Sequence, residues 1–172
     1  MGTNMADTGQ YQHTLTWRYT ERALDFIDRN QDGPFFLYLA HSMPHTPVWP
    51  SQTTFSNADG TTWPQFAGSS GVSYYYDIVK EIDHSMGRIF DKLQALGIDD
   101  DTMVIFTSDN GPWLSFSGRV ALDDDDFSVG SAYPLRESKN STYEGGPRVP
   151  CIARWPGEIP AGQVTGEVAG HI

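Results

Sequence analysis

A carboxylate and an amide stand side by side near the end of a predicted strand. The apolar, β-branched residues 102–106 predict a buried strand, and Asp109 and Asn110 follow shortly after, just before Gly111. Ligands of open α/β sheets bind beyond the carboxyl ends of the strands. Carboxylate and amide oxygens suit calcium or magnesium, whereas histidine in place of Asn110 would favour a transition metal. Spacing alone supports a metal site and a simple Asx turn or helix cap equally well.

A second predicted strand is followed by two histidines. Residues 35–40 are apolar, and His41 and His45 come next, in a segment that also contains Pro44 and Pro47. Histidines four residues apart meet on one face of a helix, but the prolines exclude a regular helix and therefore a helical zinc site. A histidine beyond a strand can bind an oxyanion or protonate a leaving group. For either histidine taken alone, an ordinary position on a surface loop is the simpler interpretation.

A third group of residues supplies positive charge. Lys139 precedes Gly145 and Gly146, and Arg148 follows them. The two glycines allow the backbone to turn sharply or to approach a neighbouring segment closely. A lysine ammonium group is a compact charge that suits a tetrahedral oxyanion. For Arg148 we favour a structural ion pair with Glu144 or another carboxylate.

Two further features have simpler interpretations. The only cysteine, Cys151, excludes an internal disulfide, and its position in an apolar stretch predicts a small buried side chain. The segment 151–154 superficially resembles a Cys-x-Pro/Ala-x-Arg motif, but its arginine comes one residue too early. The acidic run Asp123–Asp126 predicts a solvated loop tip, with an additional calcium site as the alternative.

The elements that must position these residues alternate along the chain. Apolar residues at helical spacing predict helices at 16–30 and 74–96, the second ended by Gly97. Strands are predicted at 35–40, 102–106 and 149–155, and irregular segments at 48–71 and 112–138. This order is typical of an α/β layer. We expect one domain over residues 1–172, without internal repeats, and a chain that ends before the final element of its fold.

Composition excludes several classes of partner. The chain has 172 residues, enough for one packed domain, and a formal net charge of −11. Such a charge argues against general binding to nucleic acids or anionic membranes, but local cations can still form an anion pocket. No apolar run reaches the ~18–20 residues of a membrane span. The polar N-terminus lacks the apolar core of a signal peptide, so we expect either a cytosolic protein or a chain that begins inside a longer one.

Several motifs occur in a characteristic order. They are residues 34–38 (PFFLY) with 44–47 (PHTP), 81–87 (EIDHSMG), 107–113 (TSDNGPW), and 134–139 (PLRESK) with 142–150 (TYEGGPRVP). Each is modest by itself, but the ordered set, which extends over about residues 17–162, is specific. Together the motifs resemble the sulfatase family, of the arylsulfatase-A-like type.

The resemblance implies a fold, a reaction and roles for individual residues. The fold would be an alkaline-phosphatase-like α/β/α sandwich, present here in part. The reaction would be hydrolysis of a small-molecule or saccharide sulfate ester by a formylglycine nucleophile with calcium. Asp109 and Asn110 would bind calcium, Lys139 would bind the sulfate and its leaving oxygen, and His45 rather than His41 would assist the leaving group. Divalent metal and fixed cations stabilise the charge of the transferring group in such reactions.

The sequence also departs from the family pattern. It contains neither the Cys/Ser-x-Pro/Ala-x-Arg motif that yields formylglycine nor the early pair of aspartates that completes the calcium site. The region between Trp113 and Leu135 is longer than in relatives, and Ser138 and Asn140 stand where the family commonly has glycine beside the lysine. We therefore expect an internal to C-terminal piece of a catalytic domain, inactive in isolation. Exported bacterial relatives lead us to expect a periplasmic or secreted protein.

Two alternatives remain open at the level of the sequence. One is a phosphate or phosphonate ester hydrolase of the same superfamily, against which Asn110 counts because those relatives tend to have histidine after the strand-end aspartate. The other is a non-catalytic binding domain on the same scaffold, which the missing nucleophile motif favours. Comparing the hydrolysis of sulfate and phosphate esters separates the first alternative from a sulfatase.

Overall fold

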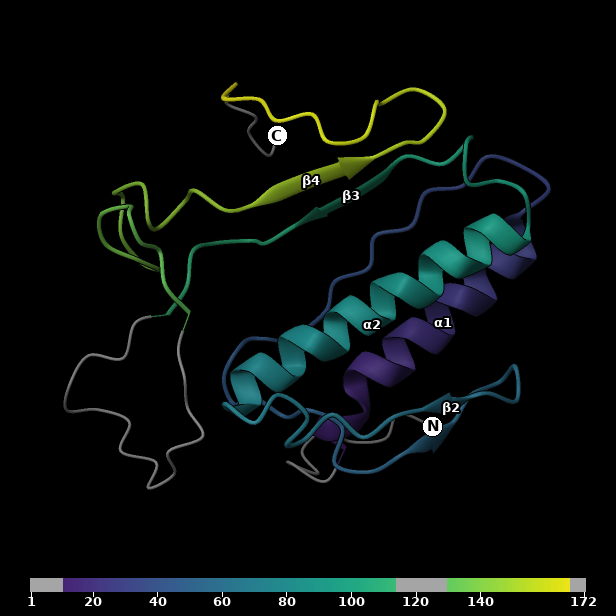
Figure 1. Cartoon of the computed structure of the whole chain (residues 1–172), viewed down its shortest axis with the longest axis horizontal. Coiled ribbons are helices and arrows are strands. Elements are labelled where there is room, and N and C mark those ends of the chain that lie inside the picture. Colours follow the sequence, from purple (N-terminus) through teal and green to yellow (C-terminus); the bar gives the residue numbers. More distant parts are fainter. Residues whose placement is uncertain (1–10, 114–129, 168–172) are drawn as a thin grey trace, which may run out of the picture.

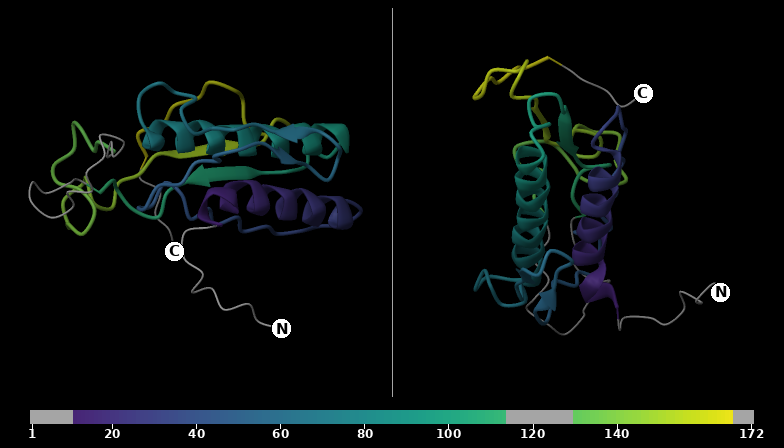
Figure 2. Two further views of the ribbon diagram at one scale, coloured as in Figure 1. Left: turned by 90° about the horizontal axis from the view of Figure 1, so that it is seen from below. Right: turned by 90° about the vertical axis from the view of Figure 1, so that its right-hand side faces the viewer.

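Two parallel helices pack against each other, and a small antiparallel sheet lies on one side of the pair (Figures 1 and 2). The computed structural model describes residues 11–113 and 130–167. The helices are α1, Leu15–Asn30, which follows the short 3₁₀ turn η1, Gln12–Thr14, and α2, Tyr74–Ala95. The sheet pairs β3, Val104–Thr107, with β4, Cys151–Arg154. A separate hairpin pairs β1, Phe55–Ser56, with β2, Thr62–Trp63.

Both helices follow from local sequence signals, and both predictions are confirmed. Helix α2 begins at Ser73, whose hydroxyl accepts a hydrogen bond from the backbone N–H of Tyr76. It ends before Gly97, which has the positive φ of 71° that glycine adopts without steric cost. Helix α1 ends at Asn30, as the apolar spacing predicts.

The core lies between the helices and the chain segments that cross them. Buried side chains from α1 and α2 form one cluster, against which alternate residues of the segment 35–39 and Val104 of β3 pack. The members are Ala23, Leu24, Ile27, Ile89 and Leu93, surrounded by Phe35, Leu37, Leu39, Met86, Leu96, Ile98 and Val104. A second cluster, Met43, Val48, Ile78 and Ile82, lies under Trp49 and Tyr74. The segment 34–40 and β3 therefore share a core and run toward the same end of the molecule (Figure 1).

Three predictions about the strands need correction. Residues 35–40 form no strand in the described structure, although their burial alternates as in one: Phe36 is 85% exposed while Phe35 packs against the core. Strand β3 is not buried, because the helices cover one face only and Ile105 is 56% exposed. The predicted loop 48–71 contains the β1–β2 hairpin.

Cys151 is also placed differently from the prediction. It lies in β4, as expected, but it is exposed rather than buried. The sheet has only two strands in the described part of the chain, so β4 lies at an edge and its first three residues are exposed. An apolar sequence alone cannot distinguish such an edge strand from a central one. The acidic run Asp123–Asp126 lies outside the described residues.

Candidate functional site

The segment that directly follows β3 carries two oxygen-bearing side chains. Asp109 is exposed, and Oδ1 of its carboxylate accepts a long hydrogen bond of 3.4 Å from the hydroxyl of Ser108. The side-chain NH₂ of Asn110 donates to the carbonyl oxygen of Gly111 at 3.0 Å. This bond fixes the amide and leaves its oxygen for another partner. A carboxylate and an amide oxygen at one strand end are donors of the kind that a hard cation prefers.

Glycine contacts join this strand end to the loop that carries Lys139. The backbone N–H of Gly111 donates to the carbonyl oxygen of Gly146 at 2.7 Å, and the N–H of Lys139 donates to Pro112 at 3.0 Å. A Cβ atom on Gly111 would lie 1.8 Å from the carbonyl oxygen of Gly145, so only glycine fits. The close approach that the sequence predicts for Gly145 and Gly146 is therefore present. It ties the backbone of the candidate anion-binding lysine to the backbone that follows the candidate metal ligands.

The loop around Lys139 is tightly turned. Glu137 and Asn140, on either side of the lysine, have positive φ angles of 63° and 71°, which non-glycine residues rarely adopt. The N–H of Gly145 donates to the carbonyl of Arg136 at 2.9 Å and closes the loop. Arg148 pairs with Glu144, with 3.0 Å between Nε and Oε2. The predicted structural ion pair of Arg148 is thus confirmed, and Lys139 has no carboxylate partner among the described residues.

The two histidines have different surroundings. His41 lies largely inside, where its Nε2 is 3.3 Å from the hydroxyl of Ser85, which in turn contacts Thr20 at 2.6 Å. Burial lowers the pKa of His41 and so favours the neutral ring. His45 is exposed, and its Nδ1 donates to the carbonyl oxygen of Thr46 at 2.7 Å, so Nε2 is the nitrogen left to meet a substrate. Of the two, His45 is the accessible one.

The four predicted site residues are only partly brought together. The segment containing His45, the end of β3 and the Lys139 loop lie toward the same end of the molecule (Figure 1). Across residues 11–113 and 130–167, however, no hydrogen bond joins His45 to Asp109, Asn110 or Lys139. Nor does this part of the chain contain a group of three or more His, Cys, Asp or Glu side chains placed to hold a metal ion.

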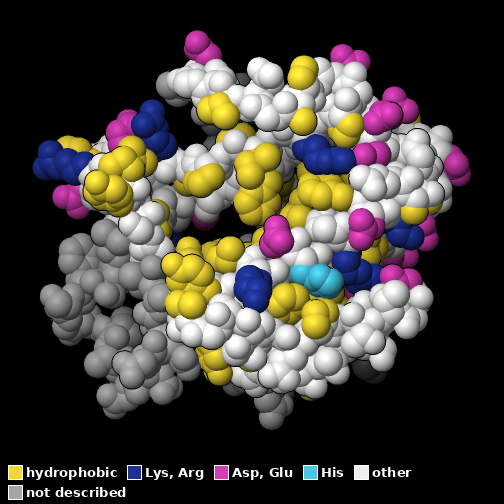
Figure 3. Space-filling view, viewed as in Figure 1, with side chains coloured by type: hydrophobic (Ala, Val, Ile, Leu, Met, Phe, Trp, Pro, Cys, Tyr) yellow, Lys and Arg dark blue, Asp and Glu magenta, His cyan; other side chains and the backbone are white. Residues whose placement is uncertain are grey.

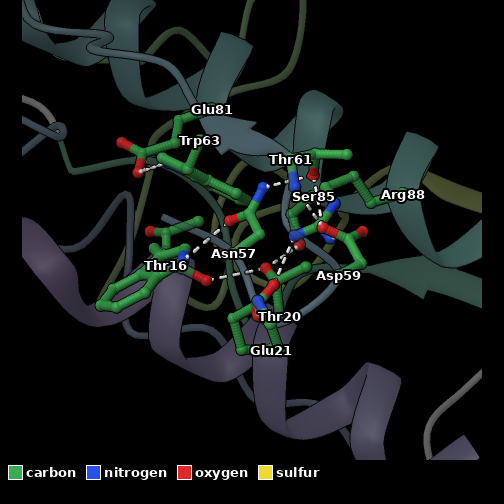
Figure 4. A network of polar contacts seen from close by, with 12 residues as sticks. Thr16, Thr20, Glu21, Asn57, Asp59, Thr61, Trp63, Glu81, Ser85 and Arg88 are labelled. Atoms are coloured by element: carbon green, nitrogen blue, oxygen red, sulfur yellow. Dashed lines mark hydrogen bonds and ion pairs between the residues drawn. The ribbon is translucent and has the colours of Figure 1, made fainter. Parts of the chain in front are cut away.

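A hollow of about 450 Å³ lies elsewhere, between the two helices and the β1–β2 hairpin. One of its charged lining residues, Arg88, pairs with Asp59, also in the lining, and with Glu21 of α1 (Figure 4). Hydrogen bonds from Thr61, and then Arg88, lower the pKa of Asp59 to about 2. This network links α1, α2 and the hairpin, so we interpret it as structural rather than as a substrate site.

Comparison with known proteins identifies the family. The sulfatase family profile matches residues 2–172. The chain belongs to the sulfatase family. Among curated sulfatases, it is 44% identical over 153 residues to N-acetylgalactosamine-6-sulfatase of Mus musculus, covering 88% of this chain and 26% of that protein. It is 37% identical over 158 residues to steryl-sulfatase of Rattus norvegicus, covering 92% and 25%.

Solved sulfatase structures confirm the predicted fold class. The chain matches the PsFucS1 sulfatase from Pseudoalteromonas sp. with a TM-score of 0.68 and 28% identity, over 88% of this chain and 26% of that one. The fold is thus part of the alkaline-phosphatase-like α/β/α sandwich of the sulfatases. The chain spans about a quarter of the length of these relatives. No helix in the described part of this sulfatase chain is long and apolar enough to cross a membrane.

Arg136, three residues before Lys139, was not among the site residues predicted from the sequence. The guanidinium of Arg136 lies over the ring of Tyr143, with 3.7 Å between its Cζ and the ring centroid. The two residues are seven positions apart in an irregular loop, where no periodic pattern indicates contact. The backbone bond from Gly145 to Arg136 folds the loop back on itself and brings the two residues together.

Proposed function

We propose that the natural protein carrying this chain hydrolyses sulfate esters with formylglycine and calcium. The observation that carries the proposal is the glycine-mediated contact between the end of β3 and the Lys139 loop. It places a carboxylate, an amide oxygen and a lysine on adjoining backbone segments, in a chain whose family is the sulfatases. The substrate we propose is a small-molecule or saccharide sulfate ester, and the location is periplasmic or secreted.

The donor set fits the implied metal. Asp109 is exposed with only a weak partner, and the amide oxygen of Asn110 is left over by the bond from its NH₂ group. Calcium, when bound, would polarise the sulfate oxygens. Because calcium takes about six to eight oxygen ligands, these two residues would supply a minority of them. We interpret them as half of a site that other segments complete.

The remaining roles belong to this chain's own side chains. Lys139 would neutralise a sulfate oxygen and the developing charge on the leaving oxygen, since fixed cations stabilise charge that grows in a transition state. His45, with both ring nitrogens protonated, would transfer the Nε2 proton to the leaving oxygen and keep the Nδ1 proton on the carbonyl of Thr46. The sequence contains no Cys/Ser-x-Pro/Ala-x-Arg motif, so we propose that the nucleophile comes from outside these residues and that the isolated chain is inactive.

Hydrolysis assays on the natural protein test this proposal. We expect faster turnover of an aryl or sugar sulfate than of the matching phosphate, and loss of activity on calcium chelation.

Lys139→Ala and Asp109→Ala should each lower kcat/KM for the sulfate by about 10²-fold or more, the usual effect of removing one group that stabilises transition-state charge. Lys92→Ala and Asp101→Ala are matched controls, because Lys92 pairs with Asp28 and Asp101 lies in an exposed turn. Faster phosphate turnover, or full activity of Lys139→Ala, would contradict the proposal, as would sulfatase activity of the isolated chain.

A further inference from the structure

Arg136 is held at the surface by an aromatic ring rather than by a carboxylate. Its guanidinium contacts one face of Tyr143 at 3.7 Å from the ring centroid, a distance typical of cation–π contacts. Both side chains are exposed, and Tyr143 is 45% accessible. A guanidinium held by one face keeps its N–H groups directed outward along its edge. This is the geometry that recognises carboxylates and sulfates through paired hydrogen bonds.

Arg136 also differs from the other arginine on its loop. Arg29, Arg88, Arg148 and Arg154 pair with carboxylates, whereas Arg18, like Arg136, lies over a tyrosine ring instead. Within the described ranges, Arg136 makes no such pair. Its charge is therefore available to an external anion, whereas that of Arg148, on the same loop, is already matched by Glu144.

The backbone fixes Arg136 close to the proposed sulfate-binding site. Its carbonyl oxygen accepts from Gly145, and Lys139, three residues later, donates its N–H to Pro112. Two hydrogen bonds thus tie the Arg136–Lys139 segment to the glycines and to the end of β3. On the surface, Lys and Arg side chains lie over this loop together with hydrophobic and acidic ones (Figure 3). Arg136 and Lys139 therefore belong to one short segment whose backbone is fixed at both residues.

Exposed aromatic residues flank these segments in the chain: Tyr133 precedes Arg136 by three positions, and Trp113 follows Pro112. Tyr133 is 89% exposed and Trp113 is 43% exposed, and flat rings of this kind pack against the apolar faces of sugars. We propose that Arg136, positioned by Tyr143, binds a second sulfate or a carboxylate of an anionic saccharide whose scissile sulfate lies at Lys139. This inference rests on the proposed function and specifies its substrate: a saccharide with at least two anionic groups.

The test compares two substrates in the natural protein. The probes are a disaccharide with one sulfate and the same disaccharide with a second sulfate or a carboxylate on the neighbouring sugar. We expect Arg136→Ala to raise KM for the doubly charged substrate about tenfold, with kcat unchanged, and to leave both constants for the singly charged substrate unchanged. Tyr143→Ala should act in the same direction, and Tyr143→Phe, which keeps the ring, should not. Arg148→Ala removes the same charge from the same loop and should change neither substrate's KM.

Calorimetric binding of the two disaccharides separates this inference from the proposed function. If neither sugar is hydrolysed but Arg136→Ala still weakens binding of the doubly charged one about tenfold, the subsite stands and the sulfatase proposal fails. If Arg136→Ala loses affinity equally for both disaccharides, or loses none for either, the proposed subsite is wrong. Sulfatase activity would be unaffected by that result. Thermal unfolding of Tyr143→Phe and Arg136→Ala confirms that the compared proteins are folded. A loss as large in Arg148→Ala as in Arg136→Ala would also overturn the subsite, because it would indicate a general charge effect.

Discussion

Single carboxylates in the interior of this molecule differ in how they are stabilised. Asp77, in the first turn of α2, accepts hydrogen bonds from the backbone N–H groups of Gly68 and Ser70, each at 2.7 Å. Glu81, one turn further along, is fully buried and accepts from the N–H and hydroxyl of Ser51 and from the indole of Trp63. Burial nevertheless dominates for Glu81 and raises its pKa, while these bonds oppose the shift.

The raised pKa predicts how stability depends on pH. Because folded Glu81 holds its proton more tightly than unfolded Glu81, its contribution is fully present below the usual glutamate pKa and is lost as pH rises through the folded value. Relative to Glu81→Gln, which does not titrate, the wild type should lose free energy of unfolding above about pH 4.5, by at most ~1.4 kcal/mol per pH unit. Urea unfolding of both proteins between pH 4 and pH 8 measures this difference. A difference that stays constant across the series would contradict the prediction.

At the residue scale, candidate side chains could be chosen from the sequence where residue type alone decides the choice. Asp109, Asn110 and Lys139 could be selected as candidates because their oxygens and ammonium group suit a cation and an oxyanion wherever the fold places them. The contact of Arg136 with Tyr143 could not be predicted, since it depends on how an irregular loop closes. The burial of Cys151 was predicted wrongly because exposure depends on the neighbouring strands and not on its own segment.

Elements with local periodicity were predictable, and elements defined by distant partners were not. The spacing of apolar residues and Gly97 determine α2 almost to the residue. A strand also needs hydrogen bonds from residues far away in the sequence, so residues 35–40 resemble a strand in pattern and yet have no pairing partner in the described part of the chain. The segment that follows β3 and the Lys139 loop, which together form the candidate site, meet through the Gly111–Gly146 bond.

Substituting two glycines tests this contact between elements. A Cβ atom on Gly111 would overlap the carbonyl oxygen of Gly145, which is backbone and cannot rotate away. Gly111→Ala should therefore lower the free energy of unfolding by ~1–3 kcal/mol, the usual cost of overpacking, and should separate the Lys139 loop from β3. A Cβ atom on Gly87, inside α2, would meet no neighbouring segment within 4 Å, so Gly87→Ala should stabilise the protein by ~0.5–1 kcal/mol.

Urea unfolding and amide chemical shifts measure both glycine variants. The shifts of Lys139 and Gly146 should change in Gly111→Ala and remain unchanged in Gly87→Ala. Unaltered stability and shifts in Gly111→Ala would mean that the two segments do not approach as closely as the structure indicates. Destabilisation by Gly87→Ala would indicate a contact on α2 that the structure does not contain.

At the scale of the whole molecule, the helices cover only one side of the sheet and of the adjoining segment (Figure 2). Side chains that alternate with the core residues form an outer face: Phe36, Tyr38, Met103 and Ile105, which are 85%, 80%, 47% and 56% exposed. Exposed apolar patches of this kind usually mark surfaces that contact other protein. The chain also spans only about a quarter of the length of its sulfatase relatives. We therefore expect the outer face to cause self-association when the chain is studied in isolation.

Sedimentation of the isolated chain tests this expectation. It should self-associate at micromolar concentration and bind a hydrophobic dye, because burying the outer face removes apolar surface from water. Phe36→Ser with Tyr38→Ser should reduce both effects without lowering stability, since neither side chain contributes to the core in this state. Val164→Ser is the matched control: this side chain is 97% exposed but lies in the segment after β4. Equally strong association of the double variant and the wild type would show that the outer face is not responsible. Association reduced by Val164→Ser alone would show that the segment after β4 is responsible.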